Sequence, residues 1–270
     1  MQSLYLFPAL LAATTASATR ILLPLYVYPS PGTAWNSIYN AIETHPSIDF
    51  SIIINPSSGP GGSTPGYNSH WITAVSKLHA YDNVDALGYV RVGYGAKALT
   101  DITADISNWD AWNHYTEADI TIDGIFFDET PNWQGTKGAN DVSFMQQLAQ
   151  LADHGGYSKV FNLGQASNHD EYFHIADMVI IFENTAEAYN NTVLNKVVAD
   201  GVTGKSAVLL HHFEGSSLTS GFAVRWLMDM VNKGLGSFAI VNTDWTHSNS
   251  DAAPMGIGIL ADMLESVLGH

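Results

Sequence analysis

Short apolar runs alternate with amphipathic stretches along most of the chain. The apolar runs predict strands over 21–28, 48–55, 84–92, 121–128, 160–163, 178–182, 207–213 and 238–242. Apolar positions at helical spacing predict helices over 33–45, 70–81, 99–115 and 141–154, a short helix after 163, and further helices ending near 199, 230 and 268. Thr33 is expected to cap the first of these helices. Strands buried on both faces that alternate with helices are typical of parallel α/β sheets.

About eight strand–helix units in a chain of 270 residues fit the size of a (β/α)8 TIM barrel. We therefore expect an α/β protein with one barrel domain over residues 19–270. A doubly wound open sheet of six to eight strands is the alternative, because periodicity alone cannot show closure. No stretch has the composition of an interdomain linker.

The first residues have the pattern of a leader. Residues 4–13 (LYLFPALLAA) are apolar and are followed by TTASA, so residues 1–18 are expected to be a signal peptide cleaved after Ala18. The apolar run is too short to span a bilayer. The leader lacks a basic start, so a disordered or packed N-terminus is the alternative. We expect a secreted protein, extracellular or in the cell wall, whose mature chain does not insert into a membrane.

Charge and composition exclude several classes of function. There are 26 acidic and 10 basic residues, for a net charge of −16, which argues against nucleic acid as a partner. A neutral or cationic ligand is compatible with this charge. The absence of cysteine rules out disulfides, thiolate metal sites and a cysteine nucleophile. The chain has no phosphate-binding glycine motif after a strand and no GxSxG elbow, so we expect no cofactor.

Two adjacent carboxylates end the central strand. Asp128 and Glu129 would lie at the carboxyl end of that strand, the rim where α/β barrels place their chemistry. Glu183 ends the apolar run of the sixth strand in the same way. A carboxylate beside an apolar core is costly unless it is paired, so catalysis competes here with structural hydrogen bonds and salt bridges. Glu214, after the seventh strand, is a rival partner for the acid on the fourth strand.

Other polar and aromatic side chains are expected on the same rim. The candidate substrate-binding residues are Tyr26, Asn55, Tyr89, Arg91, Trp133, Asn162, His211, Asp244 and Trp245, with Tyr28, His212 and Asn242 beside them. Arg91 could pair with Asp128 or Glu129. An exposed tryptophan on the rim could support the C–H face of a sugar ring, or it could simply pack. His211 and His212 would point to opposite faces of their strand, so we expect no metal site there.

A carboxylate pair in one cleft is the minimum apparatus for glycoside hydrolysis. One group donates a proton to the leaving oxygen, and the other attacks the anomeric carbon or activates water. Carboxyls about 5–5.5 Å apart indicate retention of configuration, and about 6.5–9.5 Å indicate inversion.

The chain also resembles the spherulin-4-like family, which includes fungal glycoside hydrolase family 135. The matching stretches are 23–28 (LPLYVY), 54–61 (INPSSGPG), 88–91 (GYVR), 124–129 (GIFFDE) and 181–184 (IFEN). The resemblance implies a (β/α)8 barrel and endo-acting hydrolysis of α-1,4-linked N-acetylgalactosamine, as in galactosaminogalactan. It implies a retaining mechanism with Asp128 as nucleophile, Glu183 as acid/base and Glu129 as a supporting acid.

The chain departs from the family pattern at two strand ends. It has 162–164 (NLG) where Asn-Pro-Gly is expected, and Val92-Gly93 where a threonine is usual. The substrate is therefore less firmly indicated than the acids. A carbohydrate-binding or cell-wall structural barrel without turnover is one alternative, and hydrolysis of another hexosamine or galactan chain is a second.

Overall fold

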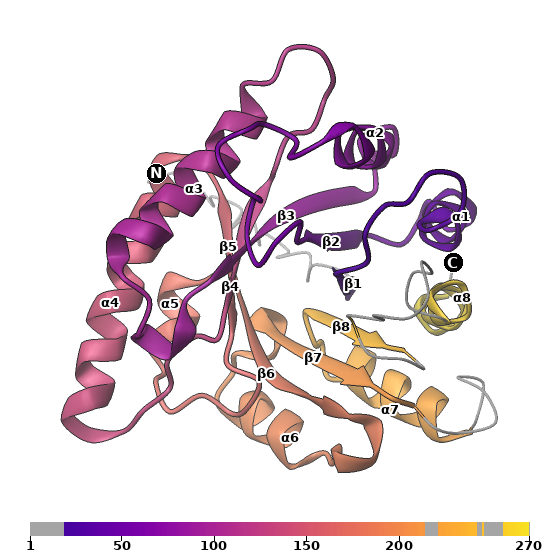
Figure 1. The fold of residues 1–270 in the computed structure, drawn as a ribbon. Coiled ribbons are helices and arrows are strands. Elements are labelled where there is room, and N and C mark those ends of the chain that lie inside the picture. The colour runs from indigo at the N-terminus through magenta and orange to yellow at the C-terminus, as the bar shows by residue number, and fades with distance from the viewer. Residues whose placement is uncertain (1–18, 214–220, 242–244, 246–255, 270) are drawn as a thin grey trace, which may run out of the picture.

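The strands close into a barrel with helices on its outside (Figure 1). The computed structural model describes residues 19–213, 221–241, 245 and 256–269. Each strand pairs in parallel with the next, and β8 pairs in parallel with β1. The predicted (β/α)8 barrel is therefore confirmed, and the open-sheet alternative is wrong. Within the described residues, every helix is too short or too polar to cross a bilayer.

The elements follow one another in regular alternation. The strands are β1 (Arg20–Leu25), β2 (Phe50–Ile54), β3 (Val84–Arg91), β4 (Gly124–Asp128), β5 (Ser158–Asn162), β6 (Met178–Thr185), β7 (Ser206–His211) and β8 (Ser237–Ile240). The helices are α1 (Asn36–Thr44), α2 (Ser69–Leu78), α3 (Leu99–Asn113), α4 (Gly135–His154), α5 (Tyr172–Ile175), α6 (Thr192–Ala199), α7 (Gly221–Asn232) and α8 (Ile257–Leu268). Helix α8 packs against α1, so the last helix lies next to the first.

Two helix starts differ from the predictions. Helix α1 begins at Asn36 without a side-chain cap, so Thr33 does not cap it. Helix α4 begins at Gly135 rather than at 141. Its first turns include Gly138, where a Cβ would lie 2.4 Å from the carbonyl oxygen of Trp133. A glycine is required by this close approach, and its poor helix propensity hides the start of the helix from the sequence pattern.

The register shows which side chains face the barrel interior. A cavity of about 240 Å³ at the amino-terminal end of the barrel is lined by Leu22, Ser51, Leu87 and Val160, so these side chains point inward. Side chains alternate along a strand, and paired residues in a parallel ladder share a face. Tyr89 and Arg91 follow Leu87 on β3 by two and four residues, so they also point inward. Asn162 follows Val160 on β5 by two residues and points inward as well. Polar strand ends thus gather at the opposite, carboxyl-terminal mouth.

The outward faces of the strands pack on the helices. Gly88 of β3 lies against Trp109 of α3, whose side chain is fully buried and donates a hydrogen bond to the backbone oxygen of Tyr89 at 2.9 Å. A Cβ at Gly88 would come within 2.7 Å of the indole ring, closer than van der Waals contact allows. The absence of a side chain at Gly88 is therefore a packing requirement of the strand–helix interface.

We expect Gly88→Ala to destabilise the fold by about 1–3 kcal/mol, because the buried indole cannot move away. Thermal unfolding monitored by circular dichroism would measure this loss. The matched control is Gly258→Ala in α8, where a Cβ meets nothing within 4 Å, so that change should stabilise the helix slightly. Equal unfolding temperatures for Gly88→Ala and the wild type would contradict the packing argument.

Candidate active site

The acids at the ends of β4 and β6 meet at one amide group. The side-chain nitrogen of Asn162 donates hydrogen bonds to Asp128 Oδ1 at 2.8 Å and to Glu183 Oε2 at 2.6 Å. Its amide oxygen accepts from the backbone N–H of Gly164 at 3.0 Å, which supports this orientation of the amide. The two hydrogens of an amide nitrogen diverge by about 120°, so the two accepting oxygens lie about 5 Å apart. The structure thus brings Asp128 and Glu183 together.

Glu183 reaches this position because β6 contains a bulge. Ile180 pairs with Asn162 on one side and Ala207 on the other, whereas Glu183 pairs with Leu209. From Ile180 to Glu183 the chain moves three residues along β6, whereas the paired segment of β7 moves only two. The register therefore shifts between Ile180 and Phe182. Regular alternation would turn Glu183 toward the helices. The extra residue returns its side chain to the barrel mouth.

Two tyrosines lie against the acid pair. The hydroxyl of Tyr89 donates a hydrogen bond of 2.5 Å to Asp128 Oδ2, so each carboxylate oxygen of Asp128 has its own donor. Burial and the negative charge of Asp128 raise the pKa of Tyr89 far above its ordinary value. Tyr26 contacts Tyr89 edge to face at 5.5 Å, and burial followed by the charges of Asp128 and Glu183 raises its pKa as well. Tyr26 is only partly buried by its neighbours.

The environment of Glu183 favours the protonated acid. Burial raises the pKa of Glu183 most strongly, the hydrogen bond from Asn162 opposes this, and the charge of Asp128 raises the pKa again. The net effect is a pKa above the ordinary glutamate value. Two carboxylates in neighbouring but different environments can hold different protonation states. Asp128, by contrast, accepts hydrogen bonds from two donors, the hydroxyl of Tyr89 and the amide of Asn162.

Glu129, next to Asp128 in the chain, binds Arg91 at the end of β3. Arg91 Nε lies 2.8 Å from Glu129 Oε2, so the predicted ion pair of Arg91 forms with Glu129. Glu129 has a φ of 54°, a left-handed conformation that costs a non-glycine residue about 1–3 kcal/mol. Backbone strain of this kind is often found at functional sites. Glu129 therefore lies beside the acid pair, where it supplies charge and anchors the loop after β4.

The predicted binding residues Asn55 and His211 also lie at the mouth. Asn55 Oδ1 accepts a hydrogen bond from the backbone N–H of Gly59 at 3.1 Å, so this side chain holds the glycine- and proline-rich loop after β2. His211 pairs with Thr185 and shares its face with Glu183, two residues earlier on β6. The Nδ1 atoms of His211 and His212 lie 2.6 Å apart. In the described part of the chain, no three His, Asp or Glu side chains are grouped as metal ligands.

The two rim tryptophans have different surroundings. Trp133 is 45% exposed, and Lys137 Nζ lies 3.5 Å from the centroid of its ring. Trp245 is only 6% exposed, so of the two alternatives for the rim tryptophans this residue takes the packed one. Its ring packs against His211 at 6.0 Å. The indole N–H is directed at Glu183 and favours the charged carboxylate, although its geometry falls short of an ordinary hydrogen bond.

Some predicted residues fall outside the described part of the chain. These are the leader 1–18, the rival acid Glu214, and Asn242 and Asp244 after β8. Tyr94 is not among the predicted site residues, yet it lies near the acids. A bulky residue between two glycines was the available signal.

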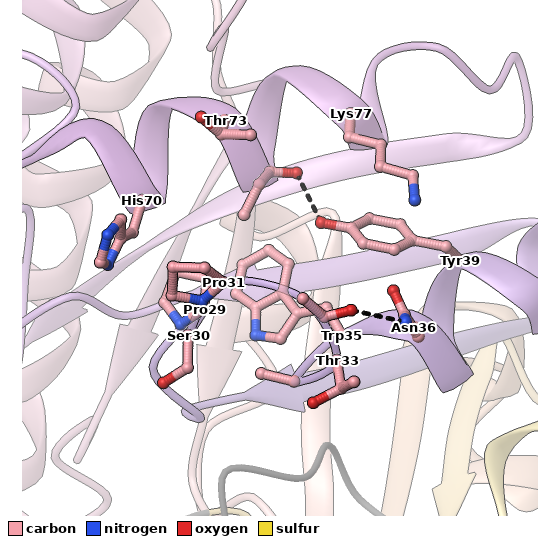
Figure 2. A pocket seen from close by; sticks show the side chains of 13 residues that line it. Pro29, Ser30, Pro31, Thr33, Trp35, Asn36, Tyr39, His70, Thr73 and Lys77 are labelled. Carbon is pink, nitrogen blue, oxygen red and sulfur yellow. Dashed lines mark hydrogen bonds between the residues drawn. The ribbon is translucent and has the colours of Figure 1, made fainter.

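A separate hollow of about 300 Å³ lies between the β1–α1 loop, α1 and α2 (Figure 2). Trp35, Tyr39, His70 and Lys77 contribute to its wall, and Lys77 Nζ lies 3.9 Å from the centroid of the Tyr39 ring. His70 Nδ1 is also 2.8 Å from the hydroxyl of Tyr28. None of the three acids lines this hollow. The hydrogen-bonded acid pair therefore defines the candidate active site.

The fold and the site together define a (β/α)8 barrel with a two-carboxylate site at its carboxyl-terminal mouth. The model of the spherulation-specific family 4 matches residues 20–252, and the chain belongs to this spherulin-4 family. Spherulin-4 of Physarum polycephalum is 31% identical over 207 residues, which is 76% of this chain and 57% of spherulin-4. The chain thus matches little more than half the length of this relative.

A solved structure shares nearly the whole fold. Sph3 of Aspergillus clavatus, crystallised in complex with GalNAc, superposes with a TM-score of 0.77 at 25% identity. The match covers 92% of this chain and 98% of Sph3. The family resemblance and the barrel expected from the sequence are both confirmed.

Proposed function

We propose that this protein is a glycoside hydrolase that cleaves chains of α-1,4-linked N-acetylgalactosamine or galactosamine. The observation that carries the proposal is the pair of hydrogen bonds that the amide nitrogen of Asn162 donates to Asp128 and to Glu183. The kinship with Sph3, a GalNAc-binding barrel of the same size, supports an amino-sugar ligand.

The separation of the acids supports a retaining mechanism. Asp128 attacks the anomeric carbon and forms a glycosyl ester while the glycosidic C–O bond breaks. Glu183 gives its proton to the departing oxygen. In the second step Glu183, now ionised, removes a proton from water, the water oxygen attacks the anomeric carbon, and the ester bond to Asp128 breaks. Glu129 and Arg91 form an ion pair beside the site and support its charge balance.

A panel of polysaccharides tests the proposal. We expect the purified protein to release reducing ends from galactosaminogalactan, with oligosaccharide products identified by mass spectrometry. If reducing ends are released only from another hexosamine or galactan chain, that polymer is the substrate instead. Binding of the polymer without any release would favour the alternative, a carbohydrate-binding barrel without turnover.

The pH dependence follows from the raised pKa of Glu183. The first step needs Glu183 protonated, so kcat/KM should fall as pH rises through this pKa. The falling limb is expected above the ordinary glutamate value of about 4.3. A profile of initial rates against pH would measure it. A falling limb at or below the ordinary glutamate value would contradict the assignment of Glu183 as the acid.

A further inference from the structure

The loop after β3 holds an aromatic residue in a left-handed turn. Gly93, Tyr94 and Gly95 have consecutive φ values of 66°, 54° and 79°. Glycine adopts this conformation freely, but a bulky L-residue does so only under strain. Tyr94 is therefore in a conformation that its own backbone preference opposes.

Contacts with the loop after β4 hold this turn in place. The backbone N–H of Tyr94 donates to the carbonyl oxygen of Glu129 at 2.7 Å, and the N–H of Val92 donates to that of Asp128 at 2.9 Å. Gly95 lies against Pro131, where a Cβ would be in ordinary contact at 3.7 Å. The turn is thus anchored directly on the residues that carry the acids.

The ring that this turn presents contributes little to packing. Tyr94 is 57% exposed, the highest value among the large hydrophobic side chains that the structure describes. Partial burial, then the charges of Glu129 and Asp128, raise the pKa of its hydroxyl, so the ring lies within reach of the acids. A residue that anchors the fold by packing would be buried, and Tyr94 is not. An exposed ring held under strain beside the acids has the properties of a ligand contact.

We propose that Tyr94 is a stacking platform for a pyranose ring of the glycan, at a subsite next to Asp128 and Glu183. The apolar C–H face of a sugar packs on an aromatic ring, and the fixed turn sets the orientation of that ring. This inference rests on the proposed function and adds a residue that positions the chain for cleavage.

Three variants test the platform. Tyr94→Gly removes the ring and relieves the backbone strain, Tyr94→Phe keeps the ring, and Met228→Ala removes an exposed apolar side chain from α7 on the outer wall. With oligosaccharides of α-1,4-linked N-acetylgalactosamine, we expect Tyr94→Gly to raise KM about 10-fold, the effect of one aromatic contact. Tyr94→Phe should change KM by no more than about 2-fold, and Met228→Ala should match the wild type.

Thermal unfolding separates this role from a structural one. If the ring serves the ligand, Tyr94→Gly unfolds at the same temperature as the wild type or higher, because a strained residue is gone. A lower unfolding temperature with an unchanged KM would overturn the proposal.

Binding measurements keep the platform separate from the hydrolase proposal. If the wild type binds the oligosaccharides without cleaving them, the hydrolase proposal fails, and calorimetry still compares Kd between wild type and Tyr94→Gly. An unchanged Kd would overturn the platform alone, and a Kd raised about 10-fold would support it. No binding by the wild type would overturn both proposals.

Discussion

Asp128→Asn and Glu183→Gln are each expected to abolish release of reducing ends from the amino-sugar polymer. Loss of the acid should lower kcat by about 10²–10⁴-fold, and loss of the nucleophile should lower it by at least about 10³-fold. Both side chains keep their size, and the amide oxygen that remains in each variant can still accept a hydrogen bond from Asn162. A reducing-end assay under saturating polymer would measure both losses.

An activated substrate distinguishes the two roles. An aryl glycoside with a leaving group of low pKa needs little protonation, so Glu183→Gln should cleave it far better than it cleaves the polymer. Asp128→Asn should be inactive on both substrates, because the glycosyl ester cannot form. The reverse pattern would exchange the roles of the two acids.

The stability of Glu183→Gln shows whether lost activity comes from lost folding. The pKa of Glu183 is raised in the folded state, so its favourable protonated form is present at low pH and is lost as pH rises through that pKa. Above it, the ionised group destabilises the fold, and glutamine removes this penalty. At neutral pH we therefore expect an unfolding temperature equal to or above that of the wild type. The difference should grow as pH rises from the ordinary glutamate pKa of about 4.3 to the raised pKa of Glu183, and it should vanish below that ordinary value, where both the folded and the unfolded states are protonated.

Asn162→Ala is the change with the second largest expected effect. It removes the donor shared by the two acids and leaves them free to move apart, so kcat should fall about 10²-fold while KM changes little. The Asn162 hydrogen bond lowers the pKa of Glu183, so its removal should move the falling limb of the pH profile to higher pH. Initial rates across the pH range, at several substrate concentrations, would measure both effects.

A second strand-end asparagine provides the control. Asn55 binds the backbone of its own loop at Gly59, so Asn55→Ala should leave the falling limb where it is. If Asn162→Ala raises KM alone and the limb does not move, Asn162 contacts the sugar rather than positioning the acids.

Much of the site could be predicted because parallel strands end on the same side of a sheet. Asp128, Asn162 and Glu183 were all placed at the rim from the polar residue that ends each apolar run. An ion pair of Arg91 with one of the acids could be predicted because Arg91 is the only basic residue that the pattern places at a strand end. Closure of the barrel did not follow, because it depends on the pairing of β8 with β1.

Features set by tertiary contacts were beyond the sequence pattern. The start of α4 was missed because Gly138 is needed for close packing, and packing overrides helix propensity there. The burial of Trp245 depends on its contact with His211 from another strand. The bulge in β6 leaves no compositional trace, since Ile181 is as apolar as its neighbours.

Because of that bulge, the orientation of Glu183 depends on a single additional residue in β6 between Ile180 and Phe182. Glu183 faces the barrel mouth only because an odd number of residue steps, three, separates it from Ile180. A relative lacking one codon in this strand could retain every acid in an alignment and still present its glutamate to the wrong side. When a function is assigned to a related barrel from a sequence alignment, the number of residues in each strand therefore has to be checked as well as the identity of the acids.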